Sequence, residues 1–401
     1  MRTIASRGVV AAAILAANLT IISVASFQAQ AQTFAVLYAF KASPDGANPF
    51  NGVAKDSAGN LYGTTESGGK FNNWGTIFTV DTSNNETILY NFTGGNDGGH
   101  PGAGLVRDSA GNLYGTTLVG GASGKGVVFK LDTAGKLTVL HTFTGTGGDG
   151  SFPSGGLIRD SAGNLYGTTS SGGRAGLGIV FKLNTANKEI VLRSFMGGSD
   201  GGRPGGGLIR DASGNLYGTT AIGGNTACNK PYGCGTVFKL DSTARETILH
   251  RFSESSGDGQ FPEGGLVRDS TGNLYGTTSV GGASFVGTVF RLNASGKETI
   301  LYAFKASGGD GQTPVASLVR DSAGNLYGIA EYGGTTGYGA VFKVDSSGKE
   351  TVLHRFNYPT DGGYPMGSLI RNPKQCRQPL WHDVERRRAQ RGNGLQSRAL
   401  N

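Results

Sequence analysis

Gly163-Asn-Leu-Tyr-Gly-Thr-Thr169 is one of six closely similar stretches in this chain of 401 residues. Successive copies are 52, 52, 51, 58 and 52 residues apart. A repeat of this length is one supersecondary unit that cannot bury its apolar side alone, so neighbouring copies must stack. The sequence therefore predicts an array of stacked repeats rather than two or three ordinary domains. The asparagines of the six copies are Asn60, Asn112, Asn164, Asn215, Asn273 and Asn325.

Each copy contains four short apolar runs separated by turn residues. In the third copy these runs lie at residues 157–160, 164–169, 178–183 and 188–195. The last run alternates apolar and polar residues, as half-buried strands do. Glycine accounts for 71 of the 401 residues and is concentrated between the runs, with no Gly-X-Y period that would indicate collagen. Four antiparallel strands in about 52 residues, repeated around a ring, are typical of a β-propeller blade.

The two ends of the array indicate its phase, that is, with which strand of a blade the array begins. Residues 33–40 match the fourth strand of the repeat, so the array begins with an outer strand that is expected to complete the last blade. The connector Asp-Gly-x-x-Pro occurs seven times, whereas the Asn-Leu-Tyr strand occurs six times. We therefore expect an all-β, seven-bladed β-propeller of four-stranded antiparallel blades whose last blade is incomplete. In this phase the Gly-Gly-Leu-x-Arg-Asp run is innermost, and the connectors share one rim with the variable Gly-Gly loops.

The N-terminus is typical of a secretion signal. Arg2 and Arg7 precede a mostly apolar stretch, and Ala29-Gln30-Ala31 is an A-x-A cleavage site. A membrane anchor is the less favoured alternative, because the apolar stretch is short for a span of about 20 residues. We expect a signal peptide over residues 1–31, export to the periplasm, cell surface or extracellular space, and no transmembrane segment after cleavage.

The repeat array is assigned to residues 33–371, and the remainder, residues 372–401, is irregular and basic. Codons for residues 377–388 can be chosen so that reading one base later gives Gly-Asn-Leu-Tyr-Gly-Thr-Thr-Trp-Asn-Gly-Gly-Ala. The same shift over residues 392–396 gives Gly-Thr-Val-Phe-Lys. We therefore interpret this tail as a frameshifted seventh repeat, with a genuine basic tail as the alternative.

The net charge of +8 does not indicate a nucleic-acid partner. The signal peptide carries +2 and residues 372–401 carry +5, which leaves +1 for the repeat array. A nearly neutral ring offers no basic stripe for phosphates. We expect no nucleic-acid binding and a monomer.

Cysteine and histidine usage indicates structural roles. Cys228 and Cys234 lie in the one insertion of the array and predict a disulfide in an exported chain, since no further Cys or His lies near them for a metal site. His141, His250 and His354 occupy one repeat position that carries Tyr or Arg in other copies, which indicates a solvent-side strand position. Catalytic and phosphate-binding motifs are absent from the sequence. We predict no catalytic residue, no metal and no cofactor.

Two sets of residues on the expected rim are candidates for ligand binding. A ring of connector carboxylates could attract cations or polar sugars, although each aspartate could instead cap its own turn. Aromatic residues of the variable loops suit stacking on sugars or peptides, or could pack their own loops. The candidates are Asp97, Asp149, Asp200, Asp258, Asp310, Asp361, Phe71, Trp74, Tyr332 and Tyr338.

Several motifs together resemble a known family. Gly-Leu-x-Arg-Asp-Ser-x-Gly-Asn-Leu-Tyr-Gly-Thr-Thr, Gly-Thr-Val-Phe-Lys-Leu and Thr-x-Leu-His-x-Phe resemble the GloVer tandem repeat of the "choice-of-anchor" bacterial surface proteins, over roughly residues 34–371. The resemblance implies an exported protein of unknown biochemical role with a C-terminal sorting or anchoring segment. No such segment is visible after Arg371, which fits the frameshift interpretation. The Asn-Leu-Tyr hairpin is also similar to repeats of NHL-type and lactonase-like propellers.

These observations favour a secreted or cell-surface binding module with an extracellular protein or carbohydrate as its partner. The alternative is a propeller hydrolase or lyase acting on a cell-wall or polysaccharide substrate. An enzyme would need an asymmetric cluster of Glu, Asp and His near the axis, for which Glu66 and Glu331 are the candidates. A purely structural envelope protein is a third possibility.

Overall fold

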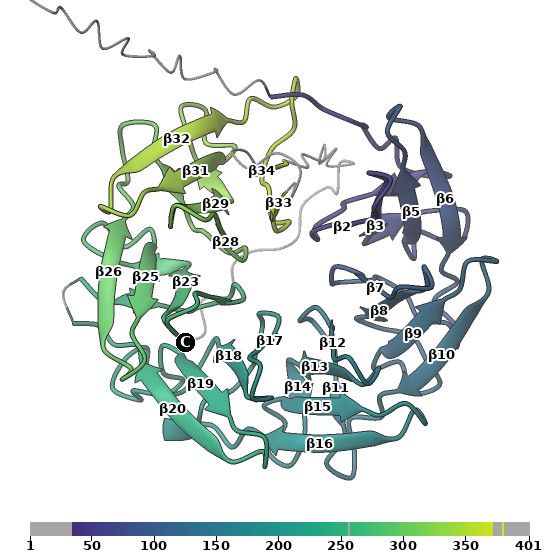
Figure 1. Cartoon of the computed structure of the whole chain (residues 1–401), viewed down its shortest axis with the longest axis horizontal. Helices are drawn as coiled ribbons and strands as arrows, with labels where there is room; N and C mark the ends of the chain where they lie inside the picture. Colours follow the sequence, from purple (N-terminus) through teal and green to yellow (C-terminus); the bar gives the residue numbers. More distant parts are fainter. Residues whose placement is uncertain (1–33, 256, 372–378, 381–401) are drawn as a thin grey trace, which may run out of the picture. The chain divides into compact units, whose positions relative to one another are not determined.

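The computed structural model describes residues 34–255, 257–371 and 379–380 (Figure 1). Within these residues the chain forms short β-strands, and the helical content is the single 3-10 turn η1 (Gly198–Asp200). Six four-stranded antiparallel sheets follow one another along the sequence, each with its strands in chain order. The predictions for residues 1–31 and for most of residues 372–401 lie outside the described residues.

Each of these sheets is one blade. The first and second blades are β2 (Ala54–Lys55), β3 (Leu61–Thr65), β5 (Thr76–Val80), β6 (Glu86–Asn91) and β7 (Val106–Arg107), β8 (Leu113–Thr117), β9 (Val127–Leu131), β10 (Leu137–Thr142). The third and fourth are β12 (Ile158–Arg159), β13 (Leu165–Thr169), β15 (Ile179–Leu183), β16 (Glu189–Ser194) and β17 (Ile209–Arg210), β18 (Leu216–Thr220), β19 (Thr236–Leu240), β20 (Glu246–Arg251). The fifth and sixth are β22 (Val267–Arg268), β23 (Leu274–Thr278), β25 (Thr288–Leu292), β26 (Glu298–Ala303) and β28 (Val319–Arg320), β29 (Leu326–Ala330), β31 (Ala340–Val344), β32 (Glu350–Arg355).

The short first strand of every blade lies innermost and the long fourth strand lies outermost, as predicted (Figure 1). The remaining strands form two-stranded pairs. These are β1 (Gly46–Ala47) with β4 (Ser67–Gly68), β11 (Gly150–Ser151) with β14 (Ser171–Gly172), β21 (Gly259–Gln260) with β24 (Val280–Gly281), β27 (Gly311–Gln312) with β30 (Tyr332–Gly333), and β33 (Ile370–Arg371) with β34 (Pro379–Leu380).

The turn before the second strand explains the Asp-Ser-x-Gly-Asn motif. In the third blade Asp160 accepts hydrogen bonds from the backbone N–H and the side-chain amide of Asn164 and from the hydroxyl of Tyr166, at 2.9, 2.8 and 3.0 Å. Burial raises the pKa of Asp160, but these hydrogen bonds have the larger combined effect and hold the pKa below its usual range. Gly163 has φ of 94°, a conformation that favours glycine. The motif therefore encodes the turn and its link to the strand.

The glycine after Leu-Tyr has a steric role. A Cβ on Gly218 would lie 2.6 Å from Cζ of Phe238 on the neighbouring strand, closer than carbon atoms can approach. Phe238 itself is fully buried. Each Asn-Leu-Tyr-Gly strand thus leaves space for the phenylalanine of the third strand. This explains why Asn-Leu-Tyr-Gly and the phenylalanine-containing third strand occur together in every copy.

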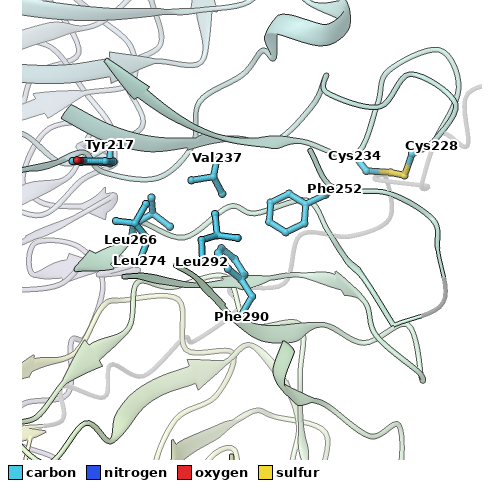
Figure 2. Packing of buried hydrophobic residues seen from close by; sticks show 9 residues of the cluster. All are labelled: Tyr217, Cys228, Cys234, Val237, Phe252, Leu266, Leu274, Phe290 and Leu292. Carbon is cyan, nitrogen blue, oxygen red and sulfur yellow. A yellow bond between two sulfur atoms is a disulfide. The ribbon is translucent and has the colours of Figure 1, made fainter. Parts of the chain in front are cut away.

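Packing between blades forms the core. Figure 2 shows this packing between the fourth and fifth blades, where the buried residues are Tyr217, Val237, Phe252, Leu266, Leu274, Phe290 and Leu292. Tyr217 is 7% exposed, and the guanidinium carbon of Arg268 from the next blade lies 5.8 Å from its ring centroid. The repeated tyrosine of this blade therefore packs between blades.

The prediction of seven blades is wrong, because the part of the chain that the structure describes forms six four-stranded blades. Residues 33–40 were expected to form an outer strand, but residues 34–40, the part that the structure describes, form none. The physical reason is local: the sequence after Arg371 contains no Asn-Leu-Tyr or Gly-Thr-Val-Phe run in this frame, and residues 34–40 pair with no strand among the described residues.

Residues 34–40 nevertheless contact both ends of the array. The ring of Phe34 stacks on that of His354 in the sixth blade, with centroids 3.8 Å apart. Phe40 packs against Phe78 of the first blade at 4.8 Å, and Ile370 contacts the same cluster. An apolar pocket remains beside it, lined by residues that include Leu61, Phe78 and Met366.

Candidate functional site

One rim of the propeller is built jointly by the connectors and the variable loops. The connector strands β1, β11, β21 and β27 pair with β4, β14, β24 and β30 of the variable loops. In the second and fourth blades a single bridge replaces the pair, between Gly99 and Val119 and between Gly202 and Ile222. The prediction that connectors and variable loops share one rim is therefore confirmed.

The connector aspartates lie within their own turns. Asp310 accepts hydrogen bonds from the backbone N–H groups of Lys305 and Gly311 at 2.9 and 2.7 Å, and its residue is 7% exposed. The other copies share the bond from the N–H four or five residues earlier, so these carboxylates hold the connector in shape. The aspartates with this bond are Asp45, Asp97, Asp149, Asp200, Asp258, Asp310 and Asp361.

The two candidate aromatics of the first blade have different environments. Trp74 is partly buried, and its indole covers Gly99, where a Cβ would lie 2.7 Å from the ring. Its ring also lies 4.9 Å from that of His100. Phe71, in the same loop, is 50% exposed. Trp74 therefore packs the loop, and Phe71 faces solvent.

The sixth blade carries a cluster of four tyrosines on the rim. The ring of Tyr364 lies 5.5 Å from Tyr332 and 5.4 Å from Tyr338, and Tyr338 lies 5.6 Å from Tyr358. Tyr332 is 41% exposed. The sequence identified Tyr332 and Tyr338 but missed Tyr358 and Tyr364, which come from the following connector. The signal was available, because Asn357-Tyr-Pro-Thr-Asp-Gly-Gly-Tyr364 carries two aromatic residues, whereas the other connectors carry at most one.

The insertion in the fourth blade is closed by a disulfide between Cys228 and Cys234 (Figure 2). Their Cα atoms are 5.6 Å apart and both cysteines are buried. Tyr232, between them in sequence, is 45% exposed. The disulfide thus pins a short loop that presents an aromatic residue.

The inner strands surround a cavity of about 320 Å³ at the axis. Among the described residues that line it, Glu263 is the one charged side chain. Burial, together with the nearby charge of Glu331, raises the pKa of Glu263. Glu331, a candidate of the enzyme alternative, therefore lies near Glu263. The other candidate, Glu66, binds Asn48 through its backbone N–H at 3.0 Å and His100 Nδ1 through its carbonyl at 2.9 Å.

A second repeated site lies beneath the rim, where the outermost strand meets the connector that follows it. A side chain of the strand contacts the connector aspartate, as Tyr302 does with Asp310 at 2.8 Å and His354 Nε2 with Asp361 at 2.9 Å. The side chains of His141, His250 and His354 are 18, 18 and 20% exposed. The prediction that this position faces solvent was wrong, because the connector folds back over the strand.

A glutamate from the next blade completes this site in five places. Glu246 lies beside Asp200 and Arg193, with its Oε2 2.7 Å from the guanidinium of Arg193. Burial and the hydrogen bond and charge of Asp200 raise the pKa of Glu246 to about 8. Leu137 stands at the equivalent position in the second blade. The five glutamates are Glu86, Glu189, Glu246, Glu298 and Glu350.

The repeated four-stranded blades around an axial cavity define a β-propeller. A family model described as the Gloeobacter/Verrucomicrobia repeat matches residues 23–230 and 224–376. The chain therefore belongs to the Gloeobacter/Verrucomicrobia repeat family, which confirms the resemblance to the GloVer repeat. No curated protein matches the sequence significantly.

Solved structures share the propeller fold at low sequence identity. The extracellular domain of a protein assigned as a one-component system from B. thetaiotaomicron is 11% identical with a TM-score of 0.55, covering 82% of this chain and 36% of that one. PorZ, a surface component of the type-IX secretion system of Porphyromonas gingivalis, is 13% identical with a TM-score of 0.51, covering 81% and 44%. This chain thus spans less than half of either protein.

A gluconolactonase from Xanthomonas campestris is 17% identical, with a TM-score of 0.40, and the match covers 67% of this chain and 77% of that one. A TM-score this low carries no argument about activity. Separately, none of the helical structure in residues 34–255, 257–371 and 379–380 is long and apolar enough to cross a membrane.

Proposed function

We propose that this protein is an exported binding module whose rim of connectors and variable loops binds carbohydrate. The observation that supports the proposal is the cluster of Tyr332, Tyr338, Tyr358 and Tyr364, in which Tyr332 is 41% exposed. Tyrosine rings offer apolar faces on which sugar rings stack, and their hydroxyls can bond sugar hydroxyls. The cluster breaks the symmetry of the repeat, as a specific site must.

Phe71 extends the proposed surface to the variable loop of the first blade, where it is 50% exposed. The connector aspartates contribute to the proposed site by holding the connectors in place, since each accepts a backbone hydrogen bond of its own turn. Asp361 does so within the connector that carries Tyr358 and Tyr364. The near-neutral charge of the array is compatible with an uncharged ligand.

The proposal is tested by measuring the binding of the purified chain to a panel of soluble polysaccharides and oligosaccharides. Tyr332→Ala is expected to weaken binding roughly tenfold, since an aromatic contact of about 1.4 kcal/mol corresponds to that factor. Tyr232→Ala, which removes a similarly exposed tyrosine from the fourth blade, is the control and is expected to leave the affinity unchanged. An equal loss of affinity in both variants would contradict the proposed carbohydrate site. So would binding to peptides without binding to any glycan.

We further propose that the chain is exported through the signal peptide at residues 1–31. Two propellers of similar fold are described as an extracellular domain and as a surface component, which supports an exported location. Expression of the full chain in a bacterium is expected to give a protein outside the cytoplasm that begins at Gln32. Ala31→Leu is expected to block that cleavage. Recovery of cytoplasmic protein that retains Met1 would contradict export.

A further inference from the structure

Two of the sites beneath the rim contain a histidine together with two carboxylates. One consists of His141, Asp149 and Glu189, and the other of His250, Asp258 and Glu298. In each site the histidine belongs to the outermost strand of one blade, the aspartate to the connector that follows, and the glutamate to the outermost strand of the next blade. One ligand atom from each residue lies within 4.8 Å of the others.

The distances within these sites are slightly longer than those between ligands of one metal ion. His141 Nε2 lies 3.5 Å from Asp149 Oδ1 and 3.9 Å from Glu189 Oε1. His250 Nε2 lies 3.5 Å from Glu298 Oε2 and 3.7 Å from Asp258 Oδ1. Nitrogen and oxygen atoms bound tetrahedrally to Zn²⁺ at 2.0–2.2 Å are about 3.4 Å apart. At 3.5 Å the contact of His141 with Asp149 is a long, weak hydrogen bond, and the other three contacts form none.

Buried polar atoms in both sites have no hydrogen-bond partner among the described residues. They include Nε2 of His250 and Oε1 of Glu298 in one site, and Oε1 of Glu189 in the other. The glutamate Oε1 is also unpaired at the equivalent sites of Glu86, Glu246 and Glu350, so Nε2 of His250 is the unpaired atom specific to a histidine site. The side chain of Asp258 is 9% exposed. Leaving such atoms unpaired is costly, whereas a cation between them would satisfy all three residues together.

The equivalent site between the third and fourth blades shows that this arrangement accepts a cation. There the guanidinium of Arg193 contacts both Asp200 and Glu246. A protein-bound positive charge thus lies between the two carboxylates where the other sites have His141 and His250. In the blades with tyrosine, the neutral hydroxyl donates to the aspartate instead.

The ligands are also held in orientation. Oδ1 of Asp258 accepts the backbone N–H of Gly259 at 2.7 Å, and Oδ2 accepts that of Ser253 at 2.8 Å. The ring of His250 packs edge-on against Phe252 at 4.7 Å. Hydrogen bonds and packing of this kind position metal ligands in protein sites.

We propose that these two clusters bind a divalent transition metal such as Zn²⁺, each ion joining two neighbouring blades. Imidazole with carboxylates suits Zn²⁺ and related ions, whereas Mg²⁺ and Ca²⁺ prefer oxygen ligands alone. The third group of potential ligands, Cys228, Cys234 and Glu254, is not included because its thiols form a disulfide.

The test uses untagged full-length protein treated with a chelator and then titrated with ZnCl₂. We expect two Zn²⁺ ions per chain, a higher unfolding temperature with Zn²⁺, and X-ray absorption that shows one imidazole nitrogen among oxygen ligands at about 2.0–2.2 Å. The double variant H141Y/H250Y is expected to lose both ions. It should fold, because Tyr90 and Tyr302 occupy this position in other blades.

His354→Tyr is the matched control. His354 bonds Asp361 at 2.9 Å as an ordinary hydrogen bond, outside both three-residue clusters, so its replacement should leave the Zn²⁺ stoichiometry unchanged. A stoichiometry that does not fall by two in the double variant overturns the proposal. So does wild-type protein that binds no Zn²⁺, in which case protons alone balance these carboxylates.

Discussion

Replacing Phe238 with alanine is expected to lower the free energy of unfolding by about 3–5 kcal/mol, because it opens a cavity in an inter-blade core. The side chain of Phe238 is fully buried and packs against Phe195 with ring centroids 5.3 Å apart. Gly218 on the neighbouring strand and Leu208, just before β17, lie in the same core beside the ring. The cavity cannot collapse easily, since those strands are fixed by their hydrogen-bonded register.

Chemical unfolding monitored by circular dichroism measures this effect. Phe285→Ala provides the control, because the same atoms are removed from a side chain that is 66% exposed, and its effect is expected to stay within about 0.5 kcal/mol. The core assignment of Phe238 would be refuted by equal stability of the two variants. A second unfolding transition in the Phe238 variant would show that the blades on either side had lost their coupling.

The second large effect is a fall in stability as the pH rises from 5 to 9. Burial and the nearby Asp45 raise the pKa of Glu86 to about 7, and burial and Asp310 do the same for Glu350. A folded-state pKa above the unfolded value means that folding favours the protonated carboxyl. The stabilisation is therefore complete below pH 4.5 and is lost as the pH passes through 7. Each carboxyl is expected to contribute on the order of 1 kcal/mol after allowance for partial exposure.

Other groups act in the opposite direction at lower pH. The turn aspartates such as Asp160 have lowered pKa values, so their contribution is present above pH 3.8 and lost in stronger acid. Burial lowers the pKa of His354, so its contribution is lost as the pH falls through and below 6.5. Together these groups place the highest stability in mildly acidic solution.

The measurement is the urea midpoint at pH 5, 7 and 9 in the presence of a chelator. Replacement of Glu86 and Glu350 by glutamine keeps the shape of both side chains and removes their ionisation, so the double variant should lose less stability above pH 6 than the wild type. The second blade supplies a natural comparison, since Leu137 stands where the other blades have glutamate. Parallel pH profiles for the two proteins would exclude these glutamates as the cause.

The repeat period, the four strands of each blade and the sharing of one rim by connectors and variable loops could all be read from the sequence. They follow from local chemistry: Asp160 and Asn164 make their turn within five residues, and Gly167 leaves space for a phenylalanine one strand away. The number of blades could not be read in this way. Counting seven connectors overestimated the number of blades, because a blade requires strands that pair with one another. Residues 34–40 pair with no strand among the described residues.

The sequence by itself thus determined the blade, since each blade is built from contacts within one repeat and the same residues recur in every copy. Only the tertiary structure decided what lies between blades. His141 meets Glu189 of the following repeat, and Tyr332 meets Tyr364 of the following connector, because stacking brings together residues of different repeats that no single sequence motif contains. The position of His141 carries histidine, tyrosine or arginine in different blades, and from the sequence this variation indicated a solvent-exposed position. In the structure each of these side chains contacts the connector aspartate beneath the rim.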